Sequence, residues 1–147
     1  EGVNGFGIRR KMNGPEEAAE GSTGDGYGSA ERRSISDIIP GAVFRVDVDN
    51  SHPLAFGLGD HYFSLKTNEL SYAPLDDGWN VGTLGDELLI AGFAGYRAQE
   101  QVKGTLVFGV EPMGRGSVVY LIDNPLYRAF WETGKFLFGN AVFMEGR

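Results

Sequence analysis

Residues 105–144 read TLVFGVEPMGRGSVVYLIDNPLYRAFWETGKFLFGNAVFM, and this stretch decides the fold. Two apolar runs, at 105–111 and 117–123, flank the short glycine-containing segment 112–116. Apolar runs on both sides of such a segment are typical of a β-hairpin. The stretch therefore predicts two antiparallel strands joined by a tight loop, with Arg115 near its tip.

The second half of this stretch predicts helices. Asp123 and Asn124 are good capping residues, and Pro125 follows them where a missing N–H costs nothing. This order predicts a helix at 126–131 that is capped by one of these side chains and buries its tryptophan. The apolar run at 135–144 predicts a further helix, although its Phe and Val content would also suit a strand.

Toward the N-terminus the pattern is mostly that of strands. Phe44, Val46 and Val48 alternate with polar residues, as in a strand with one solvent-facing side. Turn-forming residues occur at 76–78 and 85–86. They separate short apolar runs that predict strands at 61–65, 79–84 and 88–93.

Two further helix signals complete the pattern. The run Asn50-Ser51-His52-Pro53 is a helix-start signal with Pro53 in the first turn, and residues 96–102 predict another short helix that Gly104 ends. The same part of the chain thus contains both predicted strands and predicted helices. The fold class predicted from the whole pattern is α/β, with a mixed sheet of short strands followed by a C-terminal hairpin and helix.

Composition excludes several classes of protein. The chain has 147 residues, enough for one domain, with a formal net charge of −7. An acidic chain is a poor partner for nucleic acid or an anionic membrane surface. We also expect no membrane insertion, because no apolar run approaches the roughly 20 residues that span a bilayer. The absence of cysteine excludes thiolate zinc sites and cysteine nucleophiles.

Glycine divides the chain into two parts. Residues 1–34 are dense in glycine and lack apolar periodicity, so they predict a flexible arm or linker. The spacing of Gly24, Gly26 and Gly28 is not a dinucleotide fingerprint, because no strand pattern precedes it. Residues 35–147 form the predicted domain. The first residues include no initiator Met and no signal-peptide layout, so we expect a piece of a longer protein.

Two strings resemble a known family. Residues 107–120, VFGVEPMGRGSVVY, resemble the closing hairpin of glutamine-amidotransferase-like domains. Residues 123–131 and 134–143 resemble the C-terminal end of bacterial zinc carboxypeptidases, in which a secreted metallopeptidase domain precedes a domain of this type. Segments 39–57 and 78–82 are similar to the same family, so the resemblance covers about residues 34–144.

The resemblance implies a fold and a function. The fold would be glutamine-amidotransferase-like (flavodoxin-like), or only its second half. The function would be that of a non-catalytic accessory C-terminal domain of a secreted or periplasmic zinc-dependent metallocarboxypeptidase. The partner would be the protein's own peptidase domain, which would hold the zinc, with no cofactor in this chain.

The departures from the family concern its chemistry. The family's zinc site contains an H-x-x-E pair, but neither His52 nor His61 has a Glu three residues later. Glutamine amidotransferases use a catalytic cysteine, which this chain lacks. We therefore predict no catalytic residue and no metal ligand in the chain.

The remaining candidates for a ligand or contact surface each have a structural explanation. Asp76 and Asp77 would form a solvated turn, and Trp79 and Trp131 would belong to the core together with Tyr127, Phe130 and Phe136. Glycines beside Arg115 would serve the hairpin turn. Alternatively, the Asp76–Trp79 turn and neighbouring aromatic residues would make the chain a stand-alone carbohydrate- or peptide-binding module.

Two more features leave alternatives open. The oxygens of Asp47, Asp49 and Asn50, with the His52 ring, could hold a hard cation, but a solvated strand face followed by a helix cap explains them without one. The apolar segment 136–144 predicts an uncovered surface, and an unpaired strand edge would add to it. These features predict a homodimer or a docked N-terminal arm.

Overall fold

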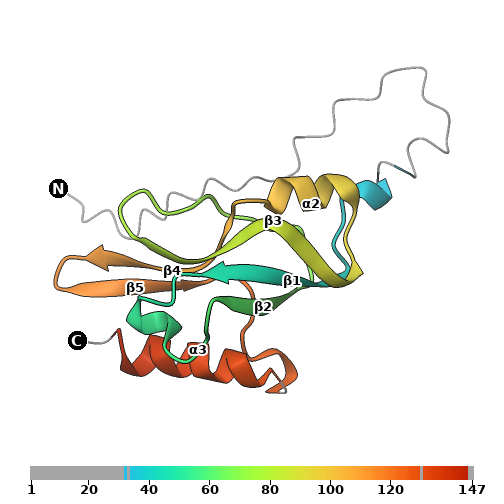
Figure 1. Ribbon diagram of the computed structural model, residues 1–147. Helices are drawn as coiled ribbons and strands as arrows, with labels where there is room; N and C mark the ends of the chain where they lie inside the picture. Colours follow the sequence, from blue (N-terminus) through green and yellow to red (C-terminus); the bar gives the residue numbers. More distant parts are fainter. Residues whose placement is uncertain (1–31, 33, 130, 146–147) are drawn as a thin grey trace.

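The computed structural model describes residue 32 and residues 34–129 and 131–145, and Figure 1 shows their arrangement. Five strands form one curled sheet in the order β2-β1-β3-β4-β5. The strands are β1 Gly41–Val48, β2 His61–Lys66, β3 Trp79–Phe93, β4 Leu106–Met113 and β5 Gly116–Leu121. Every pairing is antiparallel, so the α/β class is confirmed while the expected mixture of strand directions is not found in the described sheet.

Four helical elements follow β1 along the chain. They are η1 Pro53–Ala55, α2 Tyr96–Val102, η2 Tyr127–Ala129 and α3 Glu132–Phe143. In Figure 1 the strands lie between α2 and α3. Residues 32 and 34–36 are also helical, and the predicted arm at 1–34 lies almost wholly outside the described residues. Among the described residues, no helix combines the length and apolarity needed to cross a bilayer.

The inner side of the sheet builds the core. Ala42, Phe44 and Val46 of β1 are buried in alternation, which confirms the predicted strand with one solvent-facing side. The ring of Tyr62 on β2 packs edge-on against Phe108 of β4, with 5.7 Å between centroids. Two strands separated by β1 and β3 thus meet on the inner face, because the sheet is curled.

The prediction of two strands at 79–84 and 88–93 is wrong, because β3 runs through both without a turn. The cause lies in its pairing with β1. Val46 pairs with Leu84 while Phe44 pairs with Leu89, so a register shift absorbs the intervening residues as a bulge. The predicted short strands are therefore replaced by one strand of 15 residues.

The hairpin is confirmed with a tighter loop than expected. Met113 pairs with Gly116, which leaves only Gly114 and Arg115 in the loop. Gly114 has a φ of +61°, the left-handed conformation that a two-residue hairpin loop requires. Arg115 is therefore at the tip, as predicted.

The predicted helix at 126–131 is wrong. Asn124 Oδ1 accepts the backbone N–H of Leu126 at 2.9 Å, but only the three-residue η2 follows. Arg128 and Ala129 have positive φ values, which end the helical path. Asp123 is not a helix cap, because its carboxylate accepts hydrogen bonds from β2 instead. The helix expected at 135–144 is confirmed as α3, and its N-cap is Trp131.

Candidate functional site

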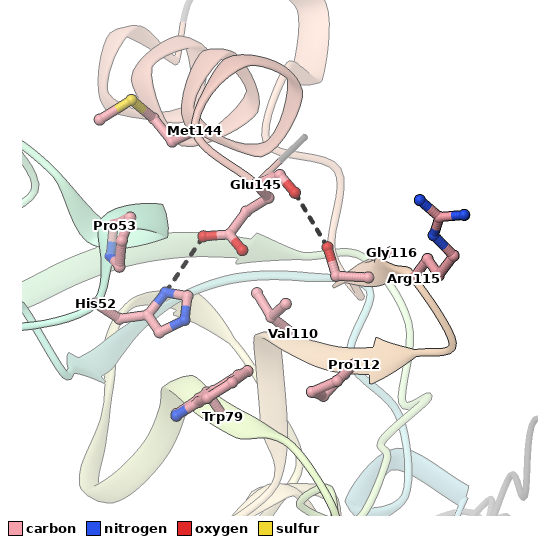
Figure 2. Close-up of a pocket in the computed structure, with 10 residues that line it drawn as sticks. His52, Pro53, Trp79, Val110, Pro112, Arg115, Gly116, Met144 and Glu145 are labelled. Atoms are coloured by element: carbon pink, nitrogen blue, oxygen red, sulfur yellow. Dashed lines mark hydrogen bonds and ion pairs between the residues drawn. The ribbon is translucent and has the colours of Figure 1, made fainter. Parts of the chain in front are cut away.

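A pocket of about 280 Å³ lies where the end of β1, the start of β3, the β4–β5 hairpin and the end of α3 meet. Figure 2 shows the residues that line it. Apolar and charged groups both contribute, as is usual for a ligand site. Its lining includes the side chains of His52, Trp79, Val110, Pro112, Met144 and Glu145.

His52 is held in place by two neighbouring groups. As N-cap of η1, its Nδ1 accepts the backbone N–H of Leu54 at 3.2 Å, which confirms the helix-cap interpretation of this residue. Glu145 Oε1 lies 3.5 Å from the same Nδ1, and the two side chains are 11% and 12% exposed. A ring nitrogen that accepts an N–H carries no proton, so in neutral His52 the proton is on Nε2.

Glu145 therefore faces a nitrogen that cannot donate to it. Its Oε1 is buried and has no hydrogen-bond donor among the described residues. The ion pair with His52 forms only when the ring gains a second proton. Burial of a carboxylate oxygen without a hydrogen-bond donor is destabilising, and a nearby positive charge would reduce this cost.

Trp79 forms an exposed wall of the pocket. Its side chain is 52% exposed, and its ring centroid lies 5.5 Å from that of His52. Trp79 is the first residue of β3, at the end of the sheet, so its ring covers the pocket instead of the core. The prediction that this tryptophan belongs to the core is wrong.

Three acidic residues lie close in sequence to residues that line the pocket. Asp76 and Asp77 are exposed in the turn before β3, as predicted for solvated residues. Asp49 accepts the hydroxyl of Ser51 at 2.6 Å and its backbone N–H at 3.1 Å. These two hydrogen bonds lower the pKa of Asp49 below its usual value, and nearby His52 adds to the effect.

Arg115 is the one cationic side chain among the residues that line this pocket. In Figure 2 its guanidinium extends away from the Glu145 carboxylate. Ser117, two residues after Arg115 and on β5, donates its hydroxyl to the backbone oxygen of Glu145 at 3.2 Å. The Ser117 hydroxyl is thus bound to Glu145 and not to His52, so the pair lacks the hydroxyl-to-imidazole hydrogen bond of a serine hydrolase.

Of the sequence-predicted surface residues, the structure brings Trp79 and Arg115 to the same pocket and leaves Trp131 elsewhere. Trp131 Nε1 donates to the backbone oxygen of Phe63 at 2.7 Å, on the edge strand β2. Sequence reasoning missed Glu145, which meets His52 only through the position of α3. A metal at the 47–52 segment gains no support, because the described residues contain no metal-type cluster of three His, Cys, Asp or Glu side chains.

A second surface feature lies on α3. Phe136 is 62% exposed and Phe143 is 78% exposed, and they share one side of the helix with Gly139. We call these three residues the α3 apolar face. Asn140 holds the helix in place, since its Nδ2 donates to the backbone oxygens of Leu54 and Phe56. The prediction that Phe136 belongs to the core is therefore wrong.

Two other aromatic residues were also expected in the core. Tyr127 is half-buried, and Phe130 lies outside the described residues.

Among known proteins, no family model, no curated protein and no solved structure matches the chain.

Proposed function

We propose that this chain is a non-catalytic accessory C-terminal domain of a secreted or periplasmic zinc-dependent metallocarboxypeptidase. The support from sequence is the resemblance of residues 107–120, 123–131 and 134–143 to the ends of such proteins. In this proposal the sheet corresponds to the second half of the amidotransferase-like, flavodoxin-like fold. The zinc and the peptide-cleaving residues belong to the peptidase domain.

The observation that carries this proposal is the α3 apolar face. Leu137, on the opposite side of the same helix, is buried, so the helix already uses its inner side in the core. Turning Phe136 and Phe143 inward would expose Leu137 and break the bonds of Asn140. An apolar surface that cannot turn inward is stabilised by a partner that covers it. The proposed partner is the peptidase domain of the same protein.

The first test is the reading frame that encodes this chain. We expect an H-x-x-E motif in the sequence upstream of residue 1. A frame without such a motif contradicts the proposal directly.

The second test uses the purified peptidase domain and this chain. Phe143→Glu places a charge on the α3 apolar face and should abolish their association in sedimentation velocity. Tyr96→Glu is the matched control, because Tyr96 is 73% exposed on α2 and should not affect association. Equal association of both variants would contradict the proposed surface. A homodimer of the isolated chain that Phe143→Glu dissociates would assign the surface to a second copy instead.

The alternative is a stand-alone carbohydrate- or peptide-binding module. The half-exposed Trp79 favours it, because an exposed aromatic ring beside a pocket provides a surface for stacking. Intact association of Phe143→Glu together with binding of an oligosaccharide or peptide that Trp79→Ala abolishes would favour this alternative.

A further inference from the structure

The pocket around Glu145 has properties that go beyond an accessory role. Its carboxylate is the group that needs explanation, because Oε1 is buried beside the unprotonated Nδ1 of neutral His52 and has no donor among the described residues. A positively charged ligand in the pocket would compensate the charge of this carboxylate. The contacts of this pocket do not depend on whether the chain packs on a peptidase domain.

Three further observations point to the charge of the ligand. The C-terminal end of α3 borders the pocket through Met144 and Glu145, and the carbonyl end of a helix favours cations. Trp79 offers an exposed ring, whose face attracts cations. Asp49 and Asp77 lie close in sequence to the pocket residues His52 and Trp79, and the guanidinium of Arg115, the one cationic side chain of the lining, extends away from the Glu145 carboxylate in Figure 2.

The size and the lining of the pocket limit the kind of ligand that it can bind. A volume of about 280 Å³ lies just below the range of roughly 300–1,000 Å³ of drug-sized ligand sites. It suits one side chain better than a cofactor or an oligosaccharide. Val110, Pro112 and Met144 add apolar surface for the methylene groups of such a chain.

We propose that this pocket binds a guanidinium group, as carried by an arginine side chain. A guanidinium is planar and stacks on aromatic rings, and its N–H groups form a fork that matches a carboxylate. It would place N–H donors at Glu145 and its flat face on Trp79, with its methylene groups against Pro112. The Nδ1 lone pair of His52 continues to accept the backbone N–H of Leu54.

The test is an NMR titration of the full chain with three probes. L-Arginine and N-acetyl-L-arginine amide both carry the guanidinium, and citrulline has the same shape without its charge. We expect both guanidinium probes to shift the indole N–H signal of Trp79, and citrulline to leave it in place. The indole signal of Trp131 is an internal control, because that group is bound to Phe63 away from the pocket.

The two guanidinium probes also distinguish the source of the group. Equal binding of the blocked probe indicates an arginine within a peptide, and binding of L-arginine alone indicates the free amino acid. Both results support the proposal. Citrulline binding as tightly as L-arginine, or no saturable binding of either guanidinium probe, would overturn it.

Two variants locate the site. Glu145→Gln should weaken binding about tenfold or more, because the charge-assisted bonds are lost. Glu132→Gln is its matched control, since Glu132 is an exposed acid at the other end of α3. Trp79→Ala should also weaken binding, measured by calorimetry. Unchanged affinity in both Glu145→Gln and Trp79→Ala, with melting temperatures equal to that of the unchanged chain, would assign the guanidinium to another surface.

Discussion

Lys66 Nζ lies 3.1 Å from Asp123 Oδ1, and both side chains are buried. Lys66 belongs to the edge strand β2, whereas Asp123 follows β5 at the other edge of the sheet. The pair therefore connects the two ends of the curled sheet. Ser64 donates to the second oxygen of Asp123 at 2.8 Å, and Lys66 also donates to the backbone oxygen of Leu70 at 2.7 Å.

Asp123→Asn should strongly lower the free energy of unfolding. It leaves the buried Lys66 without a counter-charge, and breaking a buried pair in this way costs about 3–5 kcal/mol. Asp37→Asn is the matched control, because Asp37 and Arg97 are 3.9 Å apart and both exposed, and such pairs contribute about 1 kcal/mol or less. Urea unfolding checks both. Equal losses would mean that Asp123 is not the partner on which Lys66 depends.

Stability should fall in alkaline solution through Tyr62. Burial, and secondarily the charge of Asp123, raises the pKa of Tyr62 from 10.0 to about 12. The folded state therefore keeps this proton where the unfolded state loses it, so its contribution to stability is complete below pH 10 and is lost between pH 10 and about 12. Tyr62→Phe removes this contribution, and its urea midpoint should fall less steeply with pH in that window. Parallel curves would contradict the raised pKa.

Two glycines of α3 should respond oppositely to alanine. A Cβ on Gly134 would collide with the backbone carbonyl of Pro125, so Gly134→Ala should destabilise by about 1–3 kcal/mol. A Cβ on Gly139 meets nothing within 4 Å, and Gly139→Ala should stabilise by about 0.5–1 kcal/mol through helix propensity. Thermal unfolding distinguishes them. A loss of stability in Gly139→Ala comparable to that in Gly134→Ala would contradict the described position of α3, in which Gly139 has open space around it.

Trp131→Phe should cost about 1 kcal/mol, because it removes the N–H that donates to Phe63 while keeping an aromatic ring. Trp79→Phe is the comparison, since the exposed Trp79 indole has no hydrogen bond within the described residues. We expect a smaller loss there by chemical denaturation. A larger loss for Trp79→Phe would mean that the roles of the two tryptophans are reversed.

Local patterns predicted the parts of the fold that depend on local chemistry. The alternation at 44–48 and the Gly114 loop each specify a backbone conformation without help from distant residues. Long-range pairing decided the rest. Gly85 and Asp86 have turn chemistry, but the pairing of the flanking residues Leu84 and Leu89 with β1 keeps them within one strand as part of a bulge.

The helix predicted after Asp123 failed for a related reason. Its capping carboxylate is occupied by Ser64 and Lys66, residues distant in sequence. The residues of the candidate site likewise include some that the sequence identifies and one that only the tertiary structure identifies. Trp79 and Arg115 could be selected as unusual residues in turns, whereas Glu145 gains its importance only from the docking of α3 against η1.

The unequal sequence separations of the strand pairs have a consequence for folding kinetics. Met113 and Gly116 pair across a two-residue loop, whereas Gly41 pairs with Phe93, a residue distant from it in sequence. Closing a long loop costs more chain entropy, so distant pairs form more slowly than local ones. We therefore expect the β4–β5 hairpin to form early and the alignment of β1 on β3 to limit the folding rate. Because that ladder contains the bulge at 85–88, substitutions there should change the folding rate constant more than those in the hairpin loop.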